Sequence, residues 1–307
     1  MPGYRGTVEL NTQDKLRLDR YAARLGILSR SQLKARAAKA LVNGKPVKLS
    51  CALKTGDLLE LHWNDDVLHD LVPEDIPLDV LYEDNRVIVV NKVQGMVVHP
   101  AAGNWSGTLA HALLGRVAAV WPSASDRMRP FIVHRLDKDT SGVMIAAWDS
   151  EALSFLQAQF KARTVCKSYI ALTRGAPRED EGRIAAALVR DPCNRKRFTV
   201  SETRGRAALT RFRVKQRWTL NDGSVYALIV LRPATGRTHQ LRVHLRYIGC
   251  PILGDPVYNT HDKRFPSATL ALHARRLTLV LPGSTAMRSF TAPVPRRFRE
   301  FGLIGHE

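Results

Sequence analysis

The residues best suited to chemistry lie in one short charged segment, HRLDKDTSG, at positions 134–142. An apolar stretch, residues 131–133, precedes it, and the apolar run VMIAAW follows it. A polar loop held between two buried strands is a rigid place from which to present a catalytic side chain. Asp137 is the group in this loop that could act as a nucleophile or a base. These residues alone leave a structural alternative open, in which the segment is an ion-paired turn.

Asp137 and Asp139 also form an Asp-x-Asp pair that could hold Mg²⁺. Such a site needs more oxygen ligands, and the flanking Arg135 and Lys138 would oppose a cation. We therefore expect no metal at this loop.

Two further segments carry polar side chains among apolar ones. GRTHQLRVHL, residues 236–245, follows a turn at Thr235-Gly236 and is expected to form a helix. Without a carboxylate partner, its first arginine, Arg237, would be a phosphate-binding or surface residue. KSYIAL, residues 167–172, places Tyr169 in a predicted strand, where an aromatic side chain belongs to the core by default.

The net charge points to a polyanionic partner. Lys and Arg outnumber Asp and Glu by 47 to 28, which gives +19 over 307 residues. Residues 1–75 hold 12 basic and 10 acidic residues, so the other 35 basic and 18 acidic residues leave +17 on the rest. Neutralising phosphates releases counterions, which favours RNA as the partner. We expect the main RNA-contacting surface on the second, larger part of the chain.

The cysteines and the apolar stretches bear on the compartment. Four cysteines lie far apart without a CxxC pair, so neither a zinc site nor a disulfide framework is expected. The first residues lack the apolar core of a signal peptide, and no apolar stretch approaches the roughly 20 residues of a membrane span. We expect a cytoplasmic monomer that does not associate with a membrane.

Residues 14–75 are interpreted as a small α/β module and an acidic linker. Apolar residues 16–25 recur at helical spacing, Asn43-Gly44 marks a hairpin, and LKTGDLLELHW alternates as a strand. Ser29 is placed to cap a second helix over about residues 30–41. The basic residues of this helix either contact RNA or form a solvated face: Arg30, Lys34, Arg36 and Lys39.

Residues 76–307 are predicted to form an α+β domain. Strands are expected at DVLYED, RVIVVNK and MVVHP, and then near 168–173, 208–216, 224–232 and 269–281. Helices are expected at about 107–116 and 150–162. Many strands with few, scattered helices indicate a mixed, largely antiparallel sheet.

Four segments in this order resemble the RluA-type pseudouridine synthases: VVNKVQGMVVHP, VHRLDKDTSG, KSYIAL and LRPATGRTHQLRVHL. The resemblance covers about residues 77–297, and residues 14–62 resemble the S4 RNA-binding domain that commonly precedes this catalytic domain. The run LVPEDIPLDVLYEDN followed by VVHPAAGN particularly resembles the D type of bacterial large-subunit synthase, and this resemblance implies 23S rRNA as the target. One departure is Val93, where the family usually has proline, in a segment expected to lie away from the carboxylate.

The resemblance implies a role for each matching residue. Asp137 corresponds to the catalytic aspartate, and Arg135 to the arginine that enters the RNA stack beside the extruded base. Tyr169 corresponds to the tyrosine that lies against the uracil. Arg237 corresponds to the basic residue that pairs with the aspartate, and an arginine within about 4–6 Å would favour the ionised carboxylate.

The implied reaction breaks the C1′–N1 bond of uridine and rejoins the uracil through C5, so no cofactor is expected. A base inside a stem must be flipped out first. The basic segment at residues 190–206 is expected either to grip RNA through Arg195, Lys196 and Arg197 or to be a solvated loop. The alternatives kept are the same chemistry on tRNA and a non-catalytic RNA-binding protein; a glycosidase would need a second carboxylate.

Overall fold

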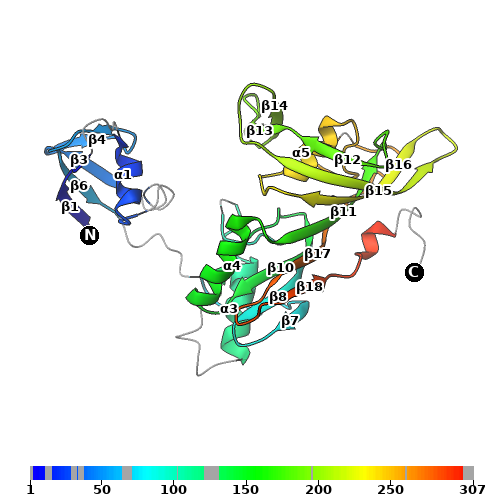
Figure 1. The fold of residues 1–307 in the computed structure, drawn as a ribbon, viewed down its shortest axis with the longest axis horizontal. Helices are drawn as coiled ribbons and strands as arrows, with labels where there is room; N and C mark the ends of the chain where they lie inside the picture. Colours follow the sequence, from blue (N-terminus) through cyan, green and yellow to red (C-terminus); the bar gives the residue numbers. More distant parts are fainter. Residues whose placement is uncertain are drawn as a thin grey trace. The chain divides into compact units, whose positions relative to one another are not determined.

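The computed structural model divides the chain into two compact units, residues 1–72 and 73–307 (Figure 1). It describes residues 3–10, 16–28, 33, 38–63, 71–101, 103–120, 131–194, 196–259 and 261–299.

The first unit is built on an antiparallel sheet in the order β1-β6-β3-β4. Asn43 and Gly44 join β3 to β4 with φ angles of 52° and 75°, the conformation that a two-residue hairpin requires. The buried side chains of α1 and of the sheet form one apolar core. The elements are β1 (Gly3–Thr7), β2 (Leu16–Arg17), α1 (Leu18–Arg24), β3 (Lys39–Val42), β4 (Lys45–Val47), β5 (Ala52–Leu53) and β6 (Leu58–His62).

The helix expected over about residues 30–41 is wrong at its C-terminal end. Lys39 and Leu41 lie in β3, which pairs with β6 and sets Ala40 opposite the fully buried Leu61. Pairing along this apolar strand overrides the helical spacing of the sequence. Lys39 is exposed on the strand, and Leu33 is helical and buried. The other basic residues of the expected helix lie outside the described residues: Arg30, Lys34 and Arg36.

The second unit contains a ten-stranded sheet, antiparallel except where β10 runs parallel to β17. The main path is β12-β15-β16-β11-β17-β10-β8-β7, with β18 on β17 and β9 on β10. The expected α+β fold on a mixed, largely antiparallel sheet is confirmed. The strands are β7 (Val80–Glu83), β8 (Val87–Lys92), β9 (Phe131–Ile132), β10 (Ser141–Ala147), β11 (Cys166–Arg174), β12 (Glu181–Ala185), β15 (Leu209–Thr219), β16 (Val225–Pro233), β17 (Leu272–Val280) and β18 (Met287–Thr291).

Two helices cover opposite faces of the half-sheet that contains β8 and β10. Val87 and Val89 pack with α4 (Ser150–Ala162), whereas the alternate residues Ile88 and Val90 pack with α3 (Leu109–Val120). Adjacent residues of a strand point to opposite faces, so burial on both faces explains the unbroken apolar run in β8.

The other half-sheet packs against α5 (Gln240–Tyr247), whose Leu241 and Leu245 join the core of β11 and β16. Beside α5 lies a separate hairpin of β13 (Ala187–Arg190) and β14 (Phe198–Ser201) (Figure 1). A short 3₁₀ helix, η2 (Arg296–Phe298), comes near the end of the described chain.

The strand expected at residues 96–100 is not formed. The carbonyls of Val97 and Val98 instead accept from the amides of Leu109 and Ala110 at 2.9 and 3.1 Å. The first amides of a helix lack intrahelical partners, so this irregular segment completes the N-terminus of α3.

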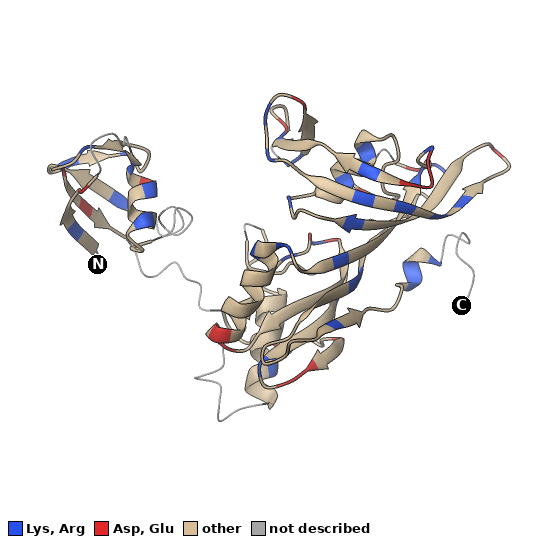
Figure 2. Ribbon diagram, in the orientation of Figure 1, with Lys and Arg blue, Asp and Glu red and all other residues tan. Residues whose placement is uncertain are grey.

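Basic residues are spread over many strands of the second unit (Figure 2). Within the described part of the chain, no helix is long and apolar enough to span a membrane.

Candidate active site

Asp137 lies in the turn between β9 and β10, and hydrogen bonds fix the main chain of this turn. The amide of Thr140 donates to the carbonyl of Asp137 at 3.1 Å. The next carbonyl, that of Lys138, accepts from the amide of Gly95 at 3.0 Å and from Nζ of Lys92 at 3.1 Å. The loop is therefore held by the end of β8 and the residues after it, as well as by β9 and β10.

Lys92 is a buried cation under this loop. Its Nζ also donates to the carbonyls of Val93 and Met96, and 1% of the residue is exposed. Burial lowers the pKa of Lys92 to about 8, against the opposing charges of Asp139 and Asp137. The segment containing Val93 was expected to lie away from the carboxylate, and this expectation is wrong. Its neighbours Lys92 and Gly95 hold the loop that carries Asp137 by direct hydrogen bonds.

The residues after the loop bring it against β17. Gly142 has a φ of +118°, and a Cβ there would lie 2.2 Å from the carbonyl oxygen of Ala274, so only glycine fits. The hydroxyl of Ser141 bonds to Nδ1 of His273 at 2.8 Å and accepts from Nη2 of Arg297 at 2.7 Å. Burial lowers the pKa of Arg297 to about 10, and burial beside Arg297 lowers the pKa of His273 to about 3. Ser141 and Gly142 at the end of the motif thus have a structural role, whereas Thr140 lines the pocket.

Asp137 pairs with Arg242 of α5. Nη1 of Arg242 lies 3.3 Å from Oδ2 of Asp137. Nε and Nη2 of the same guanidinium donate to both oxygens of Asp255 at 2.7 and 2.8 Å. Burial opposes the charge of Arg242, but the hydrogen bonds and charges of Asp255 and Asp137 outweigh burial and raise the pKa of Arg242. Arg242 is therefore a permanently charged partner for the carboxylate.

The ion pair expected between Asp137 and Arg237 is wrong. Arg237 precedes α5, and its Nε donates to the carbonyl of Ala207 at 3.2 Å. Sequence reasoning chose the first arginine of GRTHQLRVHL, although Arg242 is the one inside the helix. A usable signal was the pair of apolar residues that flank Arg242, because a buried arginine needs a carboxylate and Asp255 follows 13 residues later.

Tyr169 enters the same pocket from β11. The pairing of β11 with β17 shifts register between Ser168 and Ile170, at the position of Tyr169. The ring of Tyr169 packs against two apolar clusters, one around β11, β16 and α5 and the other around β8, β10 and α3. Burial, with a smaller contribution from the charge of Asp137, raises the pKa of Tyr169, so its hydroxyl stays protonated. Tyr169 is thus partly core, as its strand position suggested, and also a pocket residue.

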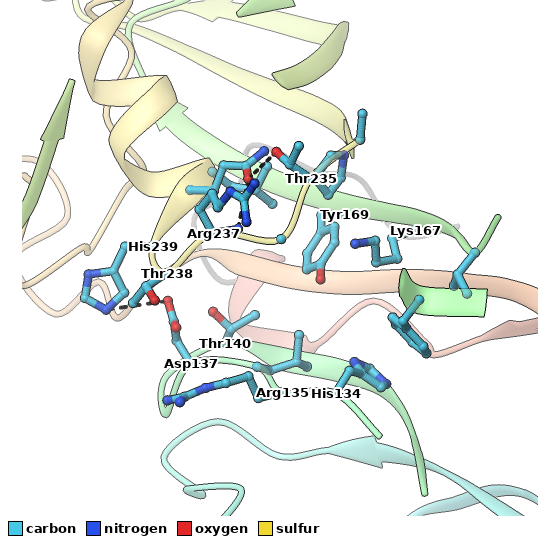
Figure 3. Close-up of a pocket in the computed structure, with 18 of the residues that line it drawn as sticks. His134, Arg135, Asp137, Thr140, Lys167, Tyr169, Thr235, Arg237, Thr238 and His239 are labelled. Atoms are coloured by element: carbon cyan, nitrogen blue, oxygen red, sulfur yellow. Dashed lines mark hydrogen bonds and ion pairs between the residues drawn. The ribbon is translucent and has the colours of Figure 1, made fainter. Parts of the chain in front are cut away.

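The four expected site residues line one cavity of about 540 Å³, which is within the range of small-ligand pockets (Figure 3). Asp137 is the one acidic residue among the described residues that line this cavity. Arg135 lies on the rim, exposed and without a side-chain partner in the described structure. The basic residues of the lining are Arg135, Lys161, Arg163, Lys167, Arg237 and Arg242.

The basic segment at residues 190–206 contains the hairpin of β13 and β14. Lys196 is exposed and Arg197 partly buried in the connecting turn, and Arg195 lies outside the described residues. Arg190 lies over the ring of Phe198, with its guanidinium carbon 5.1 Å from the ring centre. In the described part of the chain, no group of three or more His, Cys, Asp or Glu side chains could hold a metal ion.

The cavity thus brings one carboxylate and its buried arginine partner together with five further cations, an arrangement suited to an anionic substrate. Residues 86–247 match the family model described as RNA pseudouridylate synthase. The ribosomal large subunit pseudouridine synthase D of Borreliella burgdorferi is 40% identical over 93% of this chain and 88% of its own length. The chloroplastic RNA pseudouridine synthase 2 of Oryza sativa is 35% identical over 94% and 79%.

A solved structure shows the same likeness. The human RNA pseudouridylate synthase domain containing 4 superposes with a TM-score of 0.58, at 27% identity, over 72% of this chain and 90% of that one. The chain belongs to the RNA pseudouridylate synthase family and is an RNA pseudouridine synthase, as the resemblance of its motifs implied.

Proposed function

We propose that the protein converts uridine to pseudouridine in the 23S rRNA of the large ribosomal subunit. The observation that carries this target is the 40% identity, over nearly the whole of both chains, to a synthase named for the large subunit. The net charge of +17 on residues 76–307 supports a large, structured RNA as the substrate. We place the enzyme in the cytoplasm as a monomer that needs no cofactor.

Asp137 is the catalytic carboxylate in this proposal. Departure of N1 from C1′ leaves positive charge on the sugar, which a carboxylate stabilises as a nucleophile or by its charge. After the uracil turns, C5 bonds to C1′; the proton lost from C5 is balanced by one gained at N1. Nothing is oxidised or reduced. Arg242 places a permanent positive charge 3.3 Å from Oδ2 of Asp137 for this step.

Arg135 and Tyr169 serve the flipped nucleotide. Extruding a base from a stem costs a few kcal/mol. The exposed guanidinium of Arg135 can fill the vacated stack, and the ring of Tyr169 can lie against the uracil, which offsets part of that cost. The hydroxyl of Tyr169 stays protonated and does not add a second negative charge beside Asp137.

Arg237 takes a different role from the one expected, as a contact for the RNA backbone. Together with Arg163 and Lys167 it lines the pocket. Burial and the charges of Arg206 and Arg163 lower the pKa of Arg237, and burial and Arg163 lower that of Lys167. Cations that repel one another in this way are stabilised by an anion, and a phosphate beside the target uridine supplies one.

The N-terminal unit acts in this proposal as an S4-like RNA-binding module over residues 14–62, with an acidic linker to residue 75. Lys196 and Arg197 extend the RNA contact on the catalytic unit. Removing residues 1–70 should weaken RNA binding without abolishing turnover, because most of the basic surplus stays behind. Complete loss of turnover in a folded truncated protein would contradict this division of roles.

The target is tested by mapping pseudouridine in RNA from a strain that lacks the gene. We expect marks to disappear from 23S rRNA and to return with the wild-type gene but not with D137N. Loss of a tRNA mark with unchanged 23S rRNA would replace our target with tRNA. Undiminished isomerisation by purified D137N would remove Asp137 from the chemistry.

A further inference from the structure

His239, the residue before α5, forms a hydrogen-bonded pair with Tyr258. Nδ1 of His239 lies 2.8 Å from the hydroxyl oxygen of Tyr258. The same oxygen accepts from the backbone amide of Phe198 at 2.8 Å. Tyr258 is 3% exposed, so these bonds are shielded from water.

These contacts favour the tautomer of His239 that carries its proton on Nε2. The amide of Phe198 can only donate, so it occupies an acceptor position of the Tyr258 oxygen. The hydroxyl proton is then left to donate, and Nδ1 of His239 is the acceptor that the described structure offers it. Burial lowers the pKa of His239, so the ring is neutral and its one proton is on Nε2.

The protonated Nε2 faces the catalytic loop. It lies 3.8 Å from Oδ2 of Asp137, the oxygen that Arg242 also approaches (Figure 3). In the described structure, Oδ1 of Asp137 has no hydrogen-bond partner. Both nitrogens approach Oδ2, so Oδ1 is the oxygen of Asp137 that the described structure leaves available to a substrate.

The structure assigns to His239 the role of a positioning residue: its Nε2–H, fixed by Tyr258, orients Asp137 through Oδ2 so that Oδ1 meets the substrate. This inference rests on Asp137 being the catalytic carboxylate, as proposed above. The gap of 3.8 Å closes to a hydrogen bond when RNA fills the pocket, as catalytic contacts commonly tighten in the complex.

The backbone and the surrounding rings hold His239 in this place. Its φ of 55° is in the left-handed region, a conformation that side-chain-bearing residues rarely adopt and that is retained where the surroundings require it. The ring lies edge-on to Phe198 and to Tyr258, with centroid distances of 5.9 and 5.5 Å. Phe198 begins β14 of the basic hairpin, so the chain of contacts connects an RNA-binding element to Asp137.

The test compares H239A with H239Q, because glutamine restores a side-chain N–H donor and both variants bear the same cost of the left-handed backbone. The substrate is large-subunit RNA from the strain that lacks the gene. We expect H239A to lower kcat roughly 10- to 100-fold with KM within about 3-fold of wild type, and H239Q to recover most of it. H261A, an exposed histidine of the same unit, is the matched control. Wild-type kcat in H239A, or equal losses in both variants, would overturn the inference.

Y258F separates the tautomer from simple packing. The glutamine side chain of H239Q carries an N–H with or without the Tyr258 hydroxyl, whereas His239 needs that hydroxyl to keep its proton on Nε2. Y258F should therefore lower kcat about 10-fold when residue 239 is histidine and about 2-fold or less in H239Q. Equal losses in both backgrounds would contradict the role of Tyr258. A long-range ¹H–¹⁵N spectrum, with His239 assigned through its absence in H239Q, should show the proton on Nε2. A proton on Nδ1 overturns the inference, whichever RNA is the substrate. A wild-type enzyme that is inactive on large-subunit RNA refutes the proposed target and leaves the inference about His239 standing.

Discussion

Arg242 reaches Asp137 with Nη1 at 3.3 Å while its other two donor nitrogens hold both oxygens of Asp255. Asp255 is fixed in turn by the backbone amides of Val257 and Tyr258, at 2.9 and 3.0 Å. The guanidinium is therefore oriented before it meets Asp137. The side chains of Arg242 and Asp255 are 5% and 0% exposed, so one buried ion pair belongs to the core and also orients the partner of Asp137.

Replacing Arg242 should damage stability and turnover together. R242M leaves Asp255 buried without a counter-charge, which costs about 3–5 kcal/mol of unfolding free energy. R242K keeps one positive charge but cannot serve both carboxylates, so we expect a folded enzyme with kcat reduced about 100-fold or more. Urea unfolding and single-turnover rates measure the two effects. R242K with near-wild-type turnover would mean that charge alone, without the fork of donors, supports Asp137.

Replacing Arg237 should affect RNA binding far more than chemistry. We expect R237A to raise KM about 3- to 10-fold, with kcat changed less than about 3-fold, and to reduce the salt dependence of binding by about one phosphate contact. K263A removes an exposed charge outside the pocket and is the matched control. If kcat fell in R237A as far as in R242K, Arg237 would belong with the carboxylate after all.

The contrast between these two arginines shows what the sequence could supply. The loop between two strands singled out Asp137 as a candidate, but the strand position of Tyr169 predicted only a core residue, and its place in the pocket was implied by the resemblance of the motif. The partner of Asp137 comes from α5, more than 100 residues away, and depends on which helical face is buried. The motif contained both Arg237 and Arg242, and residue types alone did not choose between them.

The same limit applies to the fold. Alternating and unbroken apolar runs predicted most strands of the second unit, because burial on one or both faces leaves a local pattern. Residues 39–41 were predicted to be helical from their local spacing. Their pairing with β6 is a tertiary contact, which the local sequence does not reveal. Lys92 was passed over because its partners are carbonyl oxygens, which every residue has.

Gly142 should be one of the least replaceable glycines. G142A would bring a Cβ to 2.2 Å from the carbonyl of Ala274 where β10 joins β17, so we expect a loss of more than about 3 kcal/mol. Gly223 also has a positive φ, but a Cβ there meets nothing within 4 Å. G223A should therefore cost only about 1 kcal/mol. Thermal unfolding of the two variants measures the difference, and equal melting temperatures would show that β10 and β17 can separate without loss.

Lys92 should leave a pH-dependent signature in stability. Its folded-state pKa, about 8, is below the ordinary value of 10.5, so between these pH values the unfolded chain binds more protons than the folded one. Stability from this group therefore rises with pH over that range, by on the order of 3 kcal/mol at most. We expect the unfolding free energy of the wild type, minus that of K92M, to increase from pH 7 to pH 10.

The comparison uses the difference between the two proteins, because other groups titrate in the same range. K92M should also lower kcat, since the carbonyl of Lys138 loses the Nζ donor that helps to hold the loop carrying Asp137. Parallel stability curves would mean that Lys92 is not buried as a cation. A pH-dependent difference with unchanged kcat would mean that the Gly95 amide suffices to anchor the loop.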